Sequence, residues 1–511
     1  MILERGVVRT LDRALPTTSA LAIAGDRIAG AVGTHEDALP SPDRVDLGGR
    51  CVVPGFSDAH VHFPTWALAR GEVRLEGVSS VEEAVERVRD GLGSVREGGW
   101  LRGRGWRDAD WAEHPTREAL DAAAGEVPVA LLAHDSHSLW LNSAALARAN
   151  GDLEVEGGVV ERDSAGEPTG ILREEACWSF RDRHMEITDA EYVEAMREGL
   201  RVAAARGVTS VHDKDGWIGA LRFWQVLAAE GALSLRVWQS VPADYIGRLA
   251  ELNLRSGLGD GMLRLGYLKA FMDGTLGSQT ARMLDGTGVE ITSRDALVEI
   301  IRQASSAGWP VAVHAIGDLA NREALDAFEE TRAEWAPHRL RHRVEHAQLL
   351  APEDVGRFAE LGVAASVQFS HASSDRDVAD RFWAGKTDGA YAYRSLLDTG
   401  AVVANGSDAP IEELDPLAGI RAGVLRTIDD RPAWHPEQAL TVEQAFDATC
   451  VTPAWLAYDE HRRGKLVPGF HADLVVLNRD PFELPPEELG DVQVVATMLG
   501  GRWTHNPPPW D

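Results

Sequence analysis

The chain has 511 residues, 44% of them hydrophobic, and a formal net charge of -29 at pH 7. This length can bury a large core, in one big domain with appendages or in two or three domains. The acidic excess argues against nucleic acid and anionic membrane surfaces as partners. The N-terminus does not resemble a leader, no apolar run is long enough to span a membrane, and the three cysteines are widely spaced. We therefore expect a soluble cytoplasmic protein without disulfides or a cysteine-based zinc site.

The two ends of the chain have the character of short strands. Strand-like runs occur at 6–10, 20–23, 27–29, 473–477 and 492–498. Neither end alone has enough strands for a stable sheet. We therefore expect residues 1–54 and 464–511 to pair into one small β-rich domain beside a main body that spans 55–463.

The segment from about 65 to 195 reads as an insertion into the main body, because it is less regular and more helical. A helix is expected at 82–95, and the stretch Gly103-Arg-Gly-Trp106 resembles a turn more than a phosphate-binding loop. A strand-like run after Pro128 leads to His137. The density of Trp, His and Asp suggests a pocket wall or lid, with Trp106 and His137 as candidate substrate-binding residues. An exposed polar loop is an equal alternative.

A regular alternation of predicted helices and strands begins beyond residue 188. Thr188 and Glu191 form a capping box for a helix that ends at Gly207, and the strand-like run 208–211 follows. Alternation of helix and strand then recurs, with strands expected at 51–57, 208–211, 233–241, 263–271, 311–313, 341–345, 363–367 and 401–404. Eight such units predict an α/β protein with a (β/α)8 TIM barrel.

Potential metal ligands stand at the ends of the predicted strands. In His60-Val-His62 both imidazoles project to the same side of a strand, and the full set is His60, His62, Lys269, His314, His346 and Asp408. In a barrel of this class the chemistry lies at the C-terminal ends of the strands. Each histidine taken alone is better explained as an ordinary core residue that bonds to a backbone carbonyl. Their coincidence at separate strand ends favours one or two divalent metal ions, with zinc as the expected metal.

Lys269 is unusual because an ammonium group inside a barrel strand is costly unless it is paired. The sequence contains only four lysines, at 214, 269, 386 and 465. One solution is carboxylation of the Lys269 amine by carbon dioxide, which produces a carboxylate-like bridge between two metals. The alternative is a lysine that pairs with Asp273 or another acid.

The combined motifs resemble the amidohydrolase superfamily, and within it the YtcJ-like branch that is related to N-substituted formamide deformylases. The resemblance spans almost the whole chain and rests on His60-x-His62, Lys269-Ala-Phe-Met-Asp273-Gly274, Val313-His314-Ala-Ile-Gly-Asp318, Val344-Glu-His346-Ala and Gly406-Ser-Asp408-Ala-Pro. It implies a TIM barrel flanked by a β-sandwich built from both termini, and it assigns the six residues above to the metal centre. The chain departs from the family pattern at Gln279, at Gln368-Phe-Ser-His371 and at Lys214, which puts the substrate in doubt.

The expected activity is hydrolysis of a non-peptide carbon–nitrogen bond, such as an amide, N-acyl or N-formyl bond, by a metal-activated water. Asp408 would transfer the proton, and His371 or His137 would help to stabilise the oxyanion. Gln368 and Asp318 are further candidate pocket residues. Glu345 and Asp318 would orient the ligands, unless they are solvated loop acids.

Other activities are open at this stage. The same barrel could serve ester, lactone or phosphoester hydrolysis, a lyase or isomerase reaction, or an inactive scaffold. The expected partner is a small-molecule substrate. The sequence leaves the oligomeric state open, with a homodimer as one option.

Overall fold

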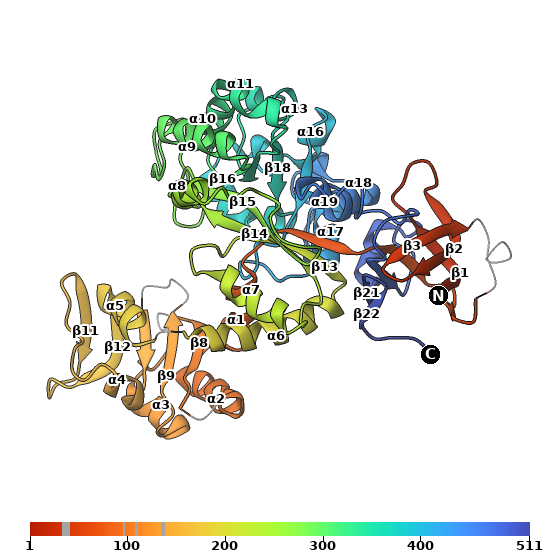
Figure 1. Cartoon of the computed structure of the whole chain (residues 1–511). Coiled ribbons are helices and arrows are strands. Elements are labelled where there is room, and N and C mark those ends of the chain that lie inside the picture. The colour runs from red at the N-terminus through yellow and green to blue at the C-terminus, as the bar shows by residue number, and fades with distance from the viewer. Residues whose placement is uncertain (33–40, 96–97, 108–110, 134–137, 186, 511) are drawn as a thin grey trace. The chain divides into compact units, whose positions relative to one another are not determined.

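A computed structural model of the chain describes residues 1–32, 41–95, 98–107, 111–133, 138–185 and 187–510. The chain divides into two compact units, one formed by Met1–Trp66 with Met196–Asp511 and the other by Ala67–Ala195. The second unit covers nearly the same residues as the expected insertion. Each unit is described by itself below, and Figure 1 labels their elements.

The larger unit contains a sheet of eight parallel strands in the order β6, β13, β14, β15, β16, β17, β18, β19. Their bounds are β6 Phe56–Val61, β13 Val208–Asp213, β14 Arg236–Pro242, β15 Leu263–Phe271, β16 Val311–Ala315, β17 Arg343–His346, β18 Ala364–Val367 and β19 Val403–Asn405. Strands that are consecutive in this series are neighbours in space. This arrangement confirms the predicted (β/α)8 class.

Helices connect the strands and cover the barrel (Figure 1). Helix α9, Arg294–Ala307, shows why they form: the Ser293 hydroxyl accepts the Ala296 N–H, and Gly308 ends the helix at φ 76°. Its Leu297 and Ile301 are buried in the barrel core. The other helices and helical turns of this unit are α1 Phe63–Ala69, α6 Asp189–Ala205, α7 Ala220–Ala229, η4 Ala243–Tyr245, α8 Ile246–Glu251, α10 Asp318–Glu330, α11 Arg332–Trp335, η5 Ala336–His338, α12 Pro352–Val355, α13 Arg357–Leu361, α14 His371–Ser374, α15 Arg376–Phe382, η6 Thr387–Gly389, α16 Tyr393–Asp398, α17 Pro416–Leu425, η7 Pro436–Gln438, α18 Val442–Phe446, η8 Asp447–Val451, α19 Thr452–Leu456 and η9 Pro486–Asp491. Helices α1 and α6 extend past the unit boundary.

The first and last barrel strands meet at their C-terminal ends. The Asp408 N–H donates to the His60 carbonyl at 2.7 Å, and the His62 N–H donates to the Ala409 carbonyl at 2.9 Å. Gly406 permits this approach, because a Cβ there would lie 2.4 Å from the His60 nitrogen. The barrel therefore closes where the predicted ligands stand.

Both ends of the chain form one hydrogen-bonded sheet in the order β22, β21, β20, β5, β1, β2, β3, with β4 paired to β1. Figure 1 shows the red N-terminal and blue C-terminal strands side by side. The strand bounds are β1 Ile2–Arg9, β2 Thr17–Ala24, β3 Arg27–Val32, β4 Arg44–Asp46, β5 Cys51–Pro54, β20 Leu474–Leu477, β21 Val494–Leu499 and β22 Arg502–His505. Buried aliphatic residues of both ends, including Leu3, Leu21, Leu474 and Met498, share one core.

The first barrel strand begins later than the predicted run 51–57. The chain is divided at Gly55, so that β5 belongs to the terminal sheet and β6 to the barrel. The Gly55 N–H donates to the Asp473 carbonyl at 3.0 Å. A Cβ at Gly55 would lie 2.2 Å from the Thr209 Oγ1. The tight packing of this glycine explains the break, which hydrophobicity alone did not indicate.

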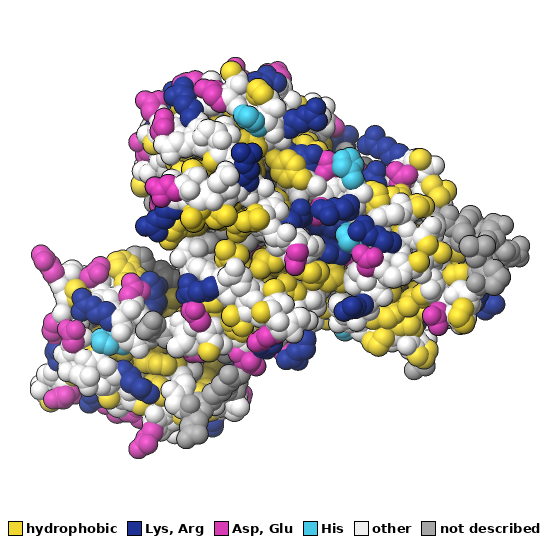
Figure 2. Space-filling view, viewed as in Figure 1, with side chains coloured by type: hydrophobic (Ala, Val, Ile, Leu, Met, Phe, Trp, Pro, Cys, Tyr) yellow, Lys and Arg dark blue, Asp and Glu magenta, His cyan; other side chains and the backbone are white. Residues whose placement is uncertain are grey.

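The smaller unit is built on a sheet in the order β11, β12, β10, β9, β8, β7. Its bounds are β7 Val73–Arg74, β8 Leu101–Trp106, β9 Val129–Ala133, β10 Ser138–Leu141, β11 Gly158–Arg162, β12 Pro168–Glu174, α2 Val81–Gly91, η2 Leu92–Ser94, α3 Arg117–Ala124, α4 Ser143–Ala147 and α5 Glu175–His184. Helix α2 therefore ends before the predicted residue 95. Acidic and basic side chains are interspersed over the face shown in Figure 2. Within the described ranges, we find no helix with the length and apolar character needed to cross a membrane.

Candidate metal centre

A cluster of histidines surrounds Asp408 at the C-terminal end of the barrel. Two sets of side chains bring potential ligand atoms within 4.8 Å of one another among the described residues, namely His60, His62 and Asp408, and His346, His371 and Asp408. Asp408 belongs to both sets. The sets combine residues from β6, β17, α14 and the turn after β19, so that four separate strand ends contribute.

The spacing within the first set suits a divalent cation. The distance from Nε2 to Oδ1 of Asp408 is 3.3 Å for His60 and 3.6 Å for His62. Tetrahedral ligand atoms bound ~2.0–2.2 Å from zinc lie about 3.4 Å apart. Imidazole and carboxylate donors are also the types that zinc prefers. The residues present therefore fit a metal ion of this kind.

Each histidine of the cluster is oriented by a buried partner. His60 Nδ1 lies 2.8 Å from Glu345 Oε2, His62 Nδ1 lies 2.7 Å from Asp215 Oδ1, and His346 Nδ1 lies 2.9 Å from Gln368 Oε1. These contacts occupy Nδ1 and direct Nε2 toward a ligand, as in carboxylate–histidine–metal arrangements.

Asp215 was not among the predicted site residues. Its carboxylate also accepts the Thr65 N–H at 3.0 Å and the Thr65 hydroxyl at 2.6 Å. It therefore joins the turn after β13 to the start of helix α1. The charged run His212-Asp-Lys-Asp215 at the end of a strand was the sequence signal that could have indicated it.

His314 and Lys269 lie beside these sets. The His314 ring centre is 4.5 Å from that of His346, and its Nε2 donates to the Gly274 carbonyl at 2.9 Å. Nδ1 is therefore the nitrogen left for a ligand role. Lys269 is buried, its Nζ has no hydrogen-bond partner among the described residues, and burial lowers its pKa to about 8. Asp273, the alternative partner for this lysine, instead accepts the backbone N–H groups of Arg282, Ile316 and Gly317.

Glu345 is the centre of a buried charge network beneath the histidines. Lys214 Nζ lies 2.5 Å and Arg343 Nε 2.8 Å from its Oε1. Burial alone would raise the pKa of Glu345, but Arg343, Lys214 and His60 hold it well below its ordinary value. Glu345 is therefore a charged partner of His60 rather than a solvated loop acid.

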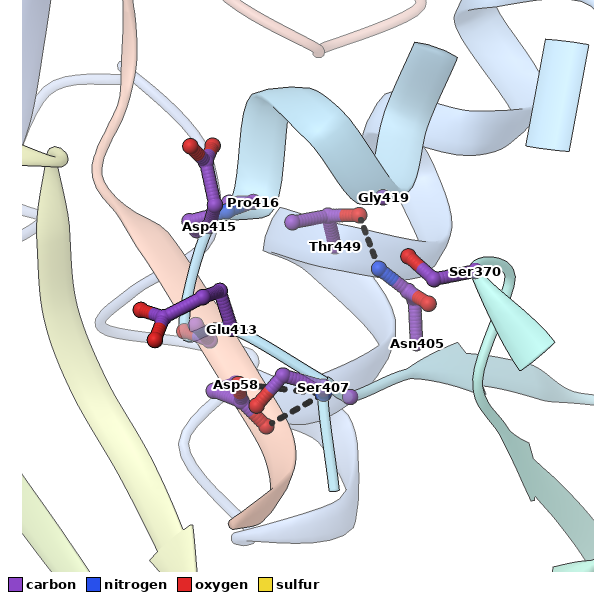
Figure 3. Close-up of a pocket in the computed structure, with 11 residues that line it drawn as sticks. Asp58, Ser370, Asn405, Ser407, Glu413, Asp415, Pro416, Gly419 and Thr449 are labelled. Atoms are coloured by element: carbon purple, nitrogen blue, oxygen red, sulfur yellow. Dashed lines mark hydrogen bonds between the residues drawn. The ribbon is translucent and has the colours of Figure 1, made fainter. Parts of the chain in front are cut away.

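Asp58 holds the turn that carries Asp408. Its carboxylate oxygens each lie 3.1 Å from the Ser407 N–H nitrogen, and Oδ1 also accepts the His60 N–H at 2.9 Å. Figure 3 shows Asp58 and Ser407 facing each other, with the contact between Asn405 and Thr449 nearby. The cavity there measures about 10 Å³, enough for a single water. This pocket supports the ligand turn and is too small for a substrate.

The backbone is strained at two of the clustered residues. His346 has φ 75° and Asp408 has φ 58°, both in the left-handed region that non-glycine residues seldom adopt. Such strain tends to occur at functional sites, where the surrounding structure enforces it.

The predicted pocket residues have different positions. His371 is buried in the cluster, with its Nδ1 3.2 Å from Gln348 Nε2 and its Nε2 3.9 Å from Asp408 Oδ2. Gln368 contacts His346, as described above. Asp318 instead begins α10, and its Oδ1 accepts the Leu284 N–H at 2.7 Å, so that it fixes a loop rather than facing a substrate.

Two further predicted residues are not part of this cluster. Trp106 is 1% exposed, and its Nε1 donates to the Leu131 carbonyl at 2.8 Å. It packs against Trp111 and Trp140 in the core of the smaller unit. A substrate-binding role for Trp106 therefore has no support in this geometry, and the tryptophan density of the segment reflects a core. His137 lies outside the described residues.

Comparisons with known proteins were made for the whole chain. A model of the amidohydrolase family matches residues 43–505. Protein LONG AFTER FAR-RED 3 of Arabidopsis thaliana is 32% identical, over 98% of this chain and 91% of its own. The putative amidohydrolase YtcJ of Bacillus subtilis is 30% identical, over 91% of this chain and 90% of its own. The N-substituted formamide deformylase of Arthrobacter pascens is 28% identical, over 97% of this chain and 96% of its own.

A solved structure shows a similar fold over nearly the whole chain. An uncharacterized metal-dependent hydrolase from Pyrococcus furiosus superposes with a TM-score of 0.80 at 30% identity. The similarity covers 94% of this chain and 99% of that one. The sequence and fold comparisons therefore point to the same class of protein.

Proposed function

Because this chain belongs to the amidohydrolase family, we propose that it is a metal-dependent hydrolase that cleaves a non-peptide carbon–nitrogen bond in an amide, N-acyl or N-formyl substrate. The matches to YtcJ and to the formamide deformylase confirm the resemblance to the YtcJ-like branch. The observation that carries the proposal is the position of Asp408, a buried carboxylate shared by two sets of histidine donors.

The proposed metal is zinc, bound as one or two ions. Its ligands would be His60, His62, His346, Asp408 and, through Nδ1, His314. A divalent metal bound there lowers the pKa of water and polarises a carbonyl group. Only the side chain of His62 is appreciably exposed among the first set, at 24% against 1% for His60, so substrate would reach the centre from the His62 side.

Asp408 is the proposed proton carrier. Burial raises its pKa above the ordinary value, which makes its carboxylate a stronger proton acceptor. It would take a proton from the attacking water and return it to the departing amine nitrogen, which restores the carboxylate.

His371 is the proposed hydrogen-bond donor to the substrate oxygen. The Gln348 amide donates to His371 Nδ1, so the ring proton of the neutral imidazole resides on Nε2. This Nε2 is buried and has no hydrogen-bond partner among the described residues. A donor kept unpaired in this way can stabilise the oxyanion that develops on the carbonyl oxygen.

Lys269 is the proposed site of carboxylation. The neutral amine adds carbon dioxide to give a carbamate and a proton, and a pKa of about 8 leaves more neutral amine near pH 7 than an exposed lysine has. The product would exchange a cation for an anion beside Asp408, which favours binding of positive metal ions.

A substrate screen with zinc-loaded protein tests the proposal. We expect release of amine from N-formyl or N-acetyl amides, loss of turnover in Asp408→Asn, and unchanged turnover in the control His505→Ala on strand β22. Turnover of esters or lactones without amides would instead establish the alternative hydrolase. No turnover and no bound metal would leave an inactive scaffold.

A further inference from the structure

An exposed tryptophan stands at the face of the barrel that carries the candidate metal centre. Trp217 is 44% exposed, whereas Trp66 and Trp224 are buried. Its ring centre lies 5.1 Å from that of Phe271 and 6.5 Å from that of His62. The Phe271 ring lies in turn 5.2 Å from His314. Two aromatic rings therefore adjoin two of the candidate ligands.

Strand positions explain why these rings meet. Phe271 is the last residue of β15, and Trp217 comes shortly after β13 ends at Asp213. Side chains at the C-terminal ends of barrel strands face the same edge as the ligands. Together, Trp217 and Phe271 form what we call the aromatic shelf.

The turn that carries Trp217 is held in place. The Gly216 N–H donates to the Lys214 carbonyl at 2.8 Å, and the Ala220 N–H donates to the Asp215 carbonyl at 3.2 Å. A Cβ at Gly216 would lie 2.9 Å from the Ser240 carbonyl oxygen, so the turn packs closely on β14. Asp215 in this turn also orients His62. Trp217 and Asp215, the residue that orients His62, therefore belong to one short, well-held segment.

The surrounding charges indicate which group the shelf would bind. Lys269 Nζ already lies 4.6 Å from the ring centre of Phe271. This amine would carry the carbamate proposed above, so in the zinc-loaded protein the repulsion of a cation on the shelf would come from the proposed metal. A neutral aromatic ring would instead gain apolar burial and offset or edge-to-face stacking.

We propose that the aromatic shelf binds a neutral aromatic group of the substrate, attached two or three bonds from the scissile carbonyl carbon. This inference rests on the proposed function, since it takes the scissile bond to lie at the cluster around Asp408. It makes aryl and arylalkyl amides the preferred substrate class. Trp217 is then a specificity-determining residue rather than part of the ligand set.

Hydroxamates test the shelf without turnover, because their headgroup chelates zinc while the substituent varies. Calorimetric titration of zinc-loaded protein should show phenylacetohydroxamate binding about tenfold more tightly than acetohydroxamate. Trp217→Ala should reduce this ratio to near unity and leave acetohydroxamate binding unchanged. Trp217→Phe, which retains a ring, should keep part of the preference. The control Trp503→Ala, on strand β22 of the terminal sheet, should behave as wild type.

Several results would overturn the inference. One is equal binding of the two hydroxamates by the wild type, and another is an undiminished preference in Trp217→Ala and in Phe271→Leu. Binding of cyclohexylacetohydroxamate as tight as that of the phenyl compound would refute the aromatic preference. Failure of acetohydroxamate to bind the wild type would refute the proposed metal centre, and the shelf with it. These results therefore distinguish failure of the aromatic shelf from failure of the proposed metal centre.

Discussion

The buried Lys269 leads to a prediction with opposite effects on the metal-free and metal-loaded protein. Burial lowers the pKa of Lys269 from its ordinary 10.5 to about 8. A fall of this size corresponds to a penalty of about 3 kcal/mol against the charged amine in the folded state. We therefore expect Lys269→Met, which is apolar and of similar length, to raise the free energy of unfolding of metal-free protein by about 3 kcal/mol at pH 7.

The sign of the pH dependence follows from proton binding. Below pH 8 the lysine is charged in both states, and the folded state carries the full penalty. Between pH 8 and 10.5 the unfolded chain binds more protons than the folded one, so the stability of the wild type rises with pH. The advantage of Lys269→Met should therefore shrink to about 1.4 kcal/mol at pH 9.5.

Urea denaturation of metal-free proteins, in buffers freed of carbon dioxide, measures this difference. Lys465→Met is the matched control, because Lys465 is 32% exposed and pairs with Asp12 at 3.2 Å. Its stability should stay within about 1 kcal/mol of the wild type. After zinc is added, Lys269→Met should lose its advantage because it binds less metal. A destabilised Lys269→Met, or a difference that does not change with pH, would refute the reasoning.

Further variants test the residues that hold His60 in place at the candidate metal centre. Glu345→Gln leaves Lys214 and Arg343 buried without a carboxylate, so unfolding free energy should fall by about 3–5 kcal/mol. The double variant with Lys214→Met should recover part of this loss, and a loss no smaller than in the single variant would contradict the charge argument. Gly406→Ala should lower zinc affinity at least about tenfold in titrations, because its Cβ would displace His60. In the control Gly247→Ala the added Cβ would meet open space, so this variant should bind zinc normally. Equal zinc affinities in Gly406→Ala and Gly247→Ala would exclude the steric effect.

The sequence predicted the barrel because its evidence is local and repeated. Helices end at glycines such as Gly207 and Gly308, and an apolar strand follows each time. Parallel strands bring their C-terminal ends to one face, so residues as distant in sequence as His60 and Asp408 could be expected to lie close together. The ligand roles of these residues stay predictions, which metal analysis tests.

Other features depend on contacts that sequence patterns do not encode. The division of the chain at Gly55 follows from its packing against Thr209, and the burial of Trp106 follows from its partners in the smaller unit. Asp215 and Gln348 orient histidines through turns whose geometry is not periodic. Such residues are found only when the three-dimensional neighbours of each imidazole are known.

The metal content of purified protein tests the central claim most directly. Elemental analysis after growth in zinc-supplemented medium should find at least about one divalent ion per chain in the wild type. The paired variant His60→Ala, His62→Ala should lose metal, and His505→Ala should retain it. No metal in the wild type, or equal metal in all three proteins, would contradict a metal centre at the Asp408 cluster.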